Sequence, residues 1–504
     1  METFVHAQSH LLIEDNLDIR QQQRSNPFHR PTVDILIRIF ELSSPHIYHE
    51  KLSVREAPLN VSHVCQYWRE VSLLMPKLWS RLVMHGKVKY ELISMMFDRT
   101  ATYPLDVHID FVRTRSRVTN EVKRFIAEKL LSVERHRLRR LHLKSTLPLI
   151  PLHLRPSGLP GYLGGLASLE ELDLRITDLP WNYATEPLVL DLSESTQLKL
   201  LKCAGQHVQF LQLNHSWFKH LLEIYLELGA DTPSDTYFAI VRSAPAVELC
   251  TISFPSVGNQ DTNFGHGNSN IPESPRTYIT TPRLKYLALV NRDDRPWSMS
   301  SIQLFETLRA IDAPTLQILN LLDFTSHGWG NATTQLELSL LSFLKRSQRS
   351  LTSVTLSARL HEPALVACIN ELRNVQHLTM ESQSCSHTVV SALRRSLGPP
   401  QSCPMPNLRN ISILCDEFTA SGDELSGMLV SRWINTDSVR AAGTDAKGTQ
   451  RRVLASQEIT FQLRVAAHQY SSLDVASFDK RDEIQDLMKR GLVIRLEARA
   501  SMYS

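Results

Sequence analysis

Two short stretches, Leu138-Arg139-Arg140-Leu141-His142-Leu143 and Leu169-Glu170-Glu171-Leu172-Asp173-Leu174, share the spacing Leu-x-x-Leu-x-Leu, and this spacing decides the fold. The pattern recurs along the chain with Val, Ile, Cys or Met at some of its positions. Further copies begin at Leu198, Val247, Leu284, Leu316, Leu351, Val375 and Leu408, and a looser copy runs from Leu222 to Leu228. Neighbouring copies start 24 to 37 residues apart. A short motif that recurs with such a period indicates a repeat array.

The alternation at the end of each copy is that of a short strand with one buried face, and the leading leucine turns the chain inward beneath it. Between the copies lie stretches that favour helix, at 121–131, 305–309, 340–345, 365–372 and 389–397. The segment Ile484 to Leu496 reads as a helix, Gly491 and a strand. We therefore predict an α/β solenoid of parallel strands backed by helices, slightly longer and less regular in period than an ideal leucine-rich repeat. A conventional open α/β fold is the alternative, and the number of copies disfavours it.

The segment 27–80 has a different pattern. Thr32 can cap a first helix that carries Ile35, Leu36, Ile39, Phe40 and Leu42, and a second helix is expected from Leu59 to Leu74. Leu78 and Trp79 follow in a Met-Pro-x-Leu-Trp corner. This unit is too small to bury all its apolar side chains, so some of them must meet the rest of the chain or a partner.

The spacing of these residues closely resembles the F-box of the large fungal F-box families. The match runs through Asp34-Ile35-Leu36-x-x-Ile39-Phe40, then Val64-Cys65-x-x-Trp68-Arg69-x-Val71, then Met75-Pro76-x-Leu78-Trp79. The resemblance implies binding to the small Skp-type adaptor of cullin–RING (SCF-type) ubiquitin ligases. The residues that it assigns to adaptor binding or to the F-box core are Ile35, Leu36, Ile39, Phe40, Val64, Cys65, Trp68, Arg69, Val71, Leu78 and Trp79. The family's opening Leu-Pro pair falls on Pro31 and Thr32, which leaves open a degenerate F-box that serves only as a structural cap.

The composition excludes several classes of function. The 55 basic and 52 acidic side chains give a formal net charge of +3, which argues against nucleic acid or an anionic membrane as partner. Seven scattered cysteines without C-x-x-C spacing predict buried free thiols. The N-terminus lacks the pattern of a signal peptide and no apolar run is long enough to span a bilayer, so a soluble intracellular protein, cytoplasmic or nuclear, is expected.

The sequence contains no pattern specific to catalysis, a cofactor or a metal. Serine-nucleophile, paired-carboxylate, HExxH and phosphate-loop patterns are missing, and no cofactor is expected. His377, Cys385, His387 and Cys403 are residue types that zinc accepts, but their irregular spacing argues against a site. We therefore predict a non-catalytic protein without a bound metal.

Three segments are expected: a helical or flexible N-terminus at 1–26, the F-box at 27–80, and the irregular leucine-rich-repeat-like solenoid at 81–504. Polar loops at 256–274 and 437–450 interrupt the solenoid. The expected function is that of a substrate receptor, which binds the ligase adaptor through the F-box and an unknown protein target through the repeats. The candidate target-binding residues on the outward sheet face are Arg139, Arg140, His142, Glu170, Glu171 and Asp173. Mutual neutralisation of these basic and acidic strands is an equally open interpretation. The alternative function is a scaffold or recognition protein outside any ligase.

Overall fold

The protein is described by a computed structural model that forms two compact units, Met1–Val122 and Lys123–Ser504. We describe each unit by itself. The described residues are 31–43, 58–85, 88–112, 119–146, 162–177, 188–205, 208–211, 218–229, 232, 234–254, 278–292, 299–323, 331–357, 360–394, 405–441, 459–466, 481–489 and 492–499. The expected helical or flexible N-terminus at 1–26 and the expected polar loop at 256–274 lie outside these ranges.

The first unit begins with a group of short helices: α2 (Val33–Ser43), α3 (Leu59–Ser62), α4 (Gln66–Leu73) and α5 (Pro76–Trp79). The helix predicted after Thr32 is confirmed as α2. The prediction of one helix from Leu59 to Leu74 is wrong, because the helix is interrupted between α3 and α4. Cys65 has extended backbone there, and its sulfur accepts a hydrogen bond from the Trp68 amide and so caps α4.

Strands β1 (Arg81–His85) and β2 (Leu105–Asp110) follow these helices and pair in parallel, with α6 (Tyr90–Asp98) between them. Leu82, Met84, Val107 and Ile109 are at most 1% exposed and form the apolar face of this pair. Alternation along each strand places Val83, His85, His108 and Asp110 on the opposite face. One face of the strand pair is therefore apolar, and the other face carries polar side chains as well.

The second unit contains a large parallel sheet whose strands follow one another in chain order. Every repeat copy that was predicted from the sequence is confirmed as a strand of this sheet. In nearly all of them the strand begins one or two residues after the first residue of the copy. The strands are β3 (Leu138–Thr146), β5 (Glu171–Thr177), β7 (Leu200–Gly205), β9 (Glu223–Leu228), β10 (Leu249–Phe254), β12 (Tyr286–Asn291), β14 (Ile318–Asp323), β15 (Ser353–Ser357), β16 (His377–Cys385), β17 (Asn410–Phe418), β18 (Ile459–Ala466) and β19 (Leu492–Arg499).

Burial of leucine explains this arrangement. The leading residues Leu169, Leu198 and Leu316 are fully buried. Leu172 and Leu174, which follow Leu169 in its copy, are fully buried as well. Fully burying each such side chain stabilises the fold by about 1.5–3 kcal/mol relative to exposure. One strand and its connection cannot cover these side chains alone, so neighbouring repeats stack, and the second unit is a solenoid-like α/β structure.

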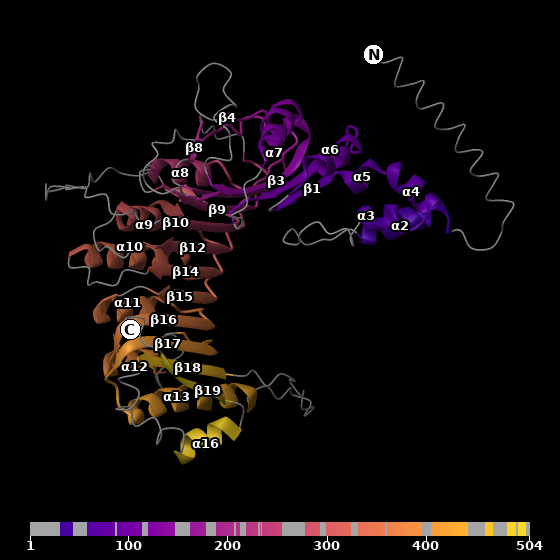
Figure 1. Ribbon diagram of the computed structural model, residues 1–504. Coiled ribbons are helices and arrows are strands. Elements are labelled where there is room, and N and C mark those ends of the chain that lie inside the picture. Colours follow the sequence, from indigo (N-terminus) through magenta and orange to yellow (C-terminus); the bar gives the residue numbers. More distant parts are fainter. Residues whose placement is uncertain are drawn as a thin grey trace, which may run out of the picture. The chain divides into compact units, whose positions relative to one another are not determined.

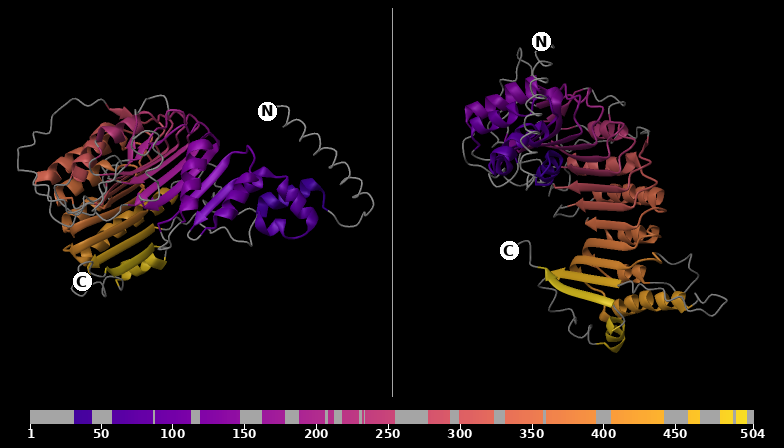
Figure 2. Two further views of the ribbon diagram at one scale, coloured as in Figure 1. Left: turned by 45° about the horizontal axis from the view of Figure 1, so that its top comes forward. Right: turned by 90° about the vertical axis from the view of Figure 1, so that its right-hand side faces the viewer.

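Helices line one side of the strand stack from β10 onward (Figures 1 and 2), and each packs against the next along the chain. Between β3 and β9 each of the three connections contains a short strand, and these strands, β4 (Tyr162–Leu163), β6 (Leu188–Leu190) and β8 (Val208–Phe210), form a small parallel sheet. A second small sheet pairs β11 (Ile279–Thr280) with β13 (Ile311–Asp312). The helices are α8 (Ser234–Arg242), α9 (Met299–Ala310), α10 (Asn331–Ser347), α11 (Glu362–Glu371), α12 (His387–Leu393), α13 (Gly422–Ala441) and α16 (Asp482–Lys489).

The helical predictions hold with changed boundaries. The stretch at 121–131 forms α7 (Asn120–Arg124) and then a π-helix, Phe125–Val133, which leads into a 3-10 turn at Arg135–Arg137. Helix α12 ends at Leu393 rather than at 397, because Arg394 has extended backbone. The polar loop predicted at 437–450 is wrong at its start, since α13 continues to Ala441. The predicted terminal helix and strand are confirmed as α16 and β19.

Two further properties of the described residues bear on function. None of their helices combines the length and the apolar character that crossing a membrane requires. The described cysteines are free thiols. Cys65 is exposed, and the others are buried: Cys203, Cys250, Cys368, Cys385 and Cys415.

Candidate functional site

Helix α2 carries two apolar stripes. Leu36 and Phe40, four residues apart, are fully buried inside the first unit. Ile35, Ile39 and Leu42 follow the i, i+4, i+7 spacing of a second helix face, and they are 52%, 39% and 61% exposed. One helix therefore contributes to the core with one stripe and presents the other to solvent.

Trp68 and Trp79 both contribute to the packing of the first unit. The Trp68 ring packs against Phe40 at 5.1 Å between centroids. Trp79 is fully buried, its indole N–H donates to the Ser72 carbonyl at 2.8 Å, and the Arg99 guanidinium lies 4.2 Å from its ring centroid. Burial of Arg99 lowers the pKa of its guanidinium. These contacts fix Trp79 as an interior residue of the unit.

The predicted adaptor-binding or core residues now divide by burial. Leu36, Phe40, Val71, Leu78 and Trp79 lie in the interior, and Trp68 is half-buried. Ile35, Ile39, Val64, Cys65 and Arg69 are exposed. Arg69 also has a local role, because its Nε donates to the Ser62 carbonyl at 2.9 Å and so ties α4 to the end of α3.

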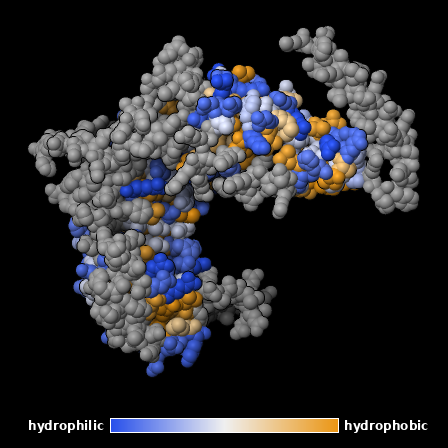
Figure 3. Space-filling view, viewed as in Figure 1, coloured by the Kyte–Doolittle hydropathy of each residue, from blue (hydrophilic) through white to orange (hydrophobic). Residues whose placement is uncertain are grey.

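Further apolar side chains of the same helices are exposed, and the sequence analysis did not assign them. They are Val33, Leu42, Leu73 and Leu74, each at least 40% exposed. Hydrophobic side chains reach the surface over this helical group in Figure 3. We call the exposed residues Ile35, Ile39, Leu42 and Val64 the apolar surface of the first unit. A concentration of exposed apolar side chains on one small unit is typical of a protein-binding surface.

Four of the six candidate target-binding residues of the second unit, Arg140, His142, Glu171 and Asp173, form a polar network across β3 and β5. The register places Arg140 opposite Glu171 and His142 opposite Asp173. Arg140 Nε lies 3.0 Å from Glu171 Oε1, and His142 Nδ1 lies 3.7 Å from Asp173 Oδ2. These contacts favour the interpretation that the basic and acidic strands neutralise each other.

Asp173 is the most buried carboxylate of this network. Burial by itself would raise its pKa, but hydrogen bonds with His142 and Arg175 outweigh burial and lower the pKa of Asp173 to about 2. Arg139 and Glu170 do not belong to the same row. Arg139 precedes Arg140 on β3, so its side chain lies on the opposite face of the sheet. Glu170 precedes β5 and pairs with Lys199 at 3.2 Å.

The residues considered for zinc from the sequence are not brought into one site. His377 and Cys385 stand at opposite ends of β16, so their Cα atoms are roughly 26 Å apart at the usual rise of a strand. His387 begins α12, and Cys403 lies outside the described residues.

A different group of metal-ligating side chains lies in the first unit. His85 ends β1, and His108 and Asp110 lie on β2. One ligand atom from each of the three side chains lies within 4.8 Å of the other two. Sequence analysis missed this group, although the His-x-Asp spacing on an alternating strand places two of its members on one face.

Comparison with known proteins adds no assignment: no family model and no curated protein sequence matches the chain. What can be said of function therefore depends on the geometry of its own side chains.

Proposed function

We propose that the chain is an F-box substrate receptor of a cullin–RING ubiquitin ligase, which binds the Skp-type adaptor through the apolar surface of its first unit. The observation that carries this proposal is the second apolar stripe of α2. Ile35, Ile39 and Leu42 are exposed while Leu36 and Phe40 already fill the core. Exposed apolar side chains in this number are a cost to an isolated unit, and covering them with a partner removes that cost.

The leucine-patterned second unit supplies the target-binding part of the proposal. Its repeats form a leucine-rich-repeat-like solenoid, and the register of neighbouring strands aligns polar side chains such as Asn320, Thr355 and Thr379 in one row across the sheet. Catalysis belongs to other subunits of the ligase, and this chain contributes proximity between target and ligase. The free cysteines are compatible with a reducing compartment such as the cytoplasm or the nucleus.

A structural cap is the second candidate. Helix α5 ends at Trp79, a single serine separates it from β1, and Trp79 is fully buried. The helical group is thus continuous with the strands of its unit and would protect them in the absence of any adaptor. In that case the chain is a scaffold or recognition protein outside a ligase.

Co-purification of the adaptor with the full chain separates the two candidates. We expect the wild-type chain to retain the adaptor and Ile39→Asp to lose it, because a charge on the exposed stripe opposes burial. The matched control is Leu338→Asp, which changes an equally apolar side chain, 58% exposed, on α10 of the second unit. Failure of the wild-type chain to bind any Skp-type adaptor would reject the receptor and leave the cap.

A further inference from the structure

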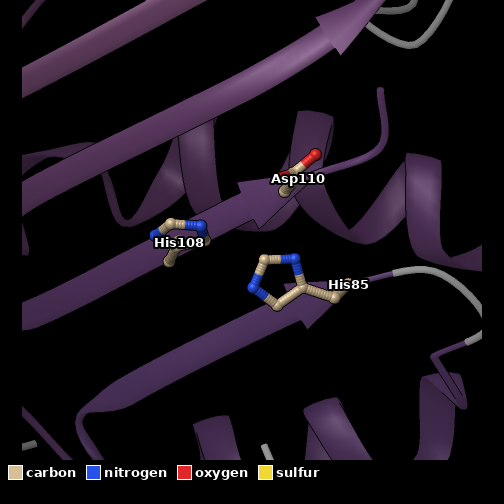
Figure 4. Close-up of side chains that lie close together, drawn as sticks. All are labelled: His85, His108 and Asp110. Carbon is tan, nitrogen blue, oxygen red and sulfur yellow. The ribbon is translucent and has the colours of Figure 1, made fainter. Parts of the chain in front are cut away.

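We propose that His85, His108 and Asp110 bind one divalent transition-metal ion at the carboxyl ends of β1 and β2. Figure 4 shows the three side chains gathered at the ends of these neighbouring strands, and their ligand atoms lie within 4.8 Å of one another. The proposal is independent of adaptor binding, since it involves none of the residues of the apolar surface.

Strand register brings the three side chains together. The parallel pairing of β1 and β2 sets His85 directly opposite Asp110 and Val83 opposite His108. Residues opposite each other in a ladder share a face, and so do residues two apart along a strand. The pairing of the two strands therefore places the two histidines and the aspartate on one face of the sheet. Their position at the carboxyl edge is where parallel sheets of α/β proteins commonly bind ligands.

The cluster is partly held in place before any ion binds. His108 is 2% exposed, and its ring lies 4.8 Å from that of His85 between centroids. One Asp110 carboxylate oxygen accepts a hydrogen bond from the Val112 amide at 3.2 Å, which limits rotation of the carboxylate. Such restraint lowers the entropy lost when an ion fixes the ligands.

The donor set selects the class of ion. Two imidazole nitrogens and one carboxylate oxygen suit Zn²⁺ and its first-row neighbours, whereas Mg²⁺ and Ca²⁺ prefer ligand sets made of oxygen. Zinc ligands at about 2.0–2.1 Å in a tetrahedron lie roughly 3.3 Å from one another. A separation within 4.8 Å leaves at most about 1.5 Å to close, which side-chain rotation supplies. Three protein ligands also leave a coordination position open to water or to another molecule.

The test uses the purified full-length chain, stripped of metal with a chelator and then titrated with Zn²⁺ by calorimetry. We expect one equivalent to bind to the wild-type chain and to raise its unfolding temperature, while Mg²⁺ does neither. Asp110→Asn, which can keep the oxygen that accepts the Val112 amide, and His85→Gln should each weaken Zn²⁺ binding by more than about 100-fold, beyond the loss typical of an outer-shell change. Substitution of Co²⁺ for Zn²⁺ gives a visible spectrum that reports ligand geometry, and both variants should lose it.

Two variants serve as controls. Asp106→Asn removes a carboxylate from the same face of β2, four residues before Asp110, and His63→Gln removes an exposed histidine of the same unit. Both should retain Zn²⁺ binding. The proposal is overturned if the wild-type chain binds no Zn²⁺, or if Asp110→Asn folds normally by circular dichroism and binds the ion as tightly as wild type. Should His85→Gln fail to fold, Asp110→Asn still decides the matter, because its side chain is only half-buried at the end of a strand.

Discussion

Replacing Ile35, Ile39 and Leu42 together by alanine is expected to abolish most of the adaptor affinity while leaving the first unit folded. The three side chains are 52%, 39% and 61% exposed, so about half of each remains available for burial by a partner. Fully burying an isoleucine or leucine contributes about 1.5–3 kcal/mol, and covering the remaining half contributes roughly 1 kcal/mol for each. The sum of about 3 kcal/mol corresponds to a Kd raised about 100-fold.

Stability should respond differently to the two stripes of the same helix. Truncating each half-exposed side chain to alanine should lower the free energy of unfolding by about 1 kcal/mol or less, because the helix propensity of alanine offsets part of the lost burial. Phe40→Ala empties a fully buried position and should cost about 3–5 kcal/mol. Only the variants of the exposed stripe therefore separate binding from folding.

The assay is a calorimetric titration of the purified adaptor into the full chain, paired with urea unfolding of each variant. Leu338→Ala in the second unit is the matched control and should bind like the wild-type chain. The reasoning is refuted if the triple variant is folded in the absence of urea and still binds the adaptor with wild-type affinity. That result would mean that the exposed stripe of α2 is not the docking surface.

Three further outcomes follow from individual side chains. Asp173 has a folded pKa of about 2, below its ordinary 3.8, so its contribution of about 2 kcal/mol is present above pH 4 and lost as the pH falls toward 2. The difference in unfolding free energy between wild type and Asp173→Asn should therefore shrink below pH 4, and a difference that stays constant there would contradict the assignment. Exposed Cys65 should react with iodoacetamide in the native chain while the buried thiols stay protected, and bound adaptor should shield it; mass spectrometry of labelled peptides gives the answer. Buried Arg432 donates from Nε to the Leu393 carbonyl at 2.7 Å, at the end of α12, and Arg432→Gln should destabilise the second unit by about 2–3 kcal/mol in urea unfolding. An unchanged unfolding midpoint for that variant would show that water replaces the guanidinium without loss.

The sequence predicted the strands of the second unit well because each has a strong local signal. A copy such as that at Leu316 places a buried leucine before the strand and alternates buried residues within it. Strand β18 shows where this signal ends. Phe461, Leu463 and Val465 alternate as expected and are at most 2% exposed, but no leucine leads the strand at the usual spacing. Pattern matching to the repeat therefore missed a strand that alternation alone could have found.

The sequence named three residues of the candidate docking surface, Ile35, Ile39 and Val64, but it could not predict which side chains of the first helix are exposed. Ile35 and Ile39 have the same i, i+4 spacing as Leu36 and Phe40, and all four are apolar. Periodicity cannot tell which pair faces the core, because the answer depends on where α4 and α5 pack. The break at Cys65 is a similar case, since a run of residues compatible with one long helix is divided by tertiary packing and by a cap that the thiol supplies.

The histidine and aspartate cluster shows the limit of sequence spacing most clearly. His85 and His108 are separated along the chain by α6, so no motif length connects them. Their proximity depends on the register in which β1 pairs with β2, and a slip of one residue would turn the paired side chains toward opposite faces. In this register Leu82 lies opposite Val107 and Met84 opposite Ile109 on the other face, and all four side chains are at most 1% exposed. Whether two imidazoles and a carboxylate can share one metal ion thus depends on this register.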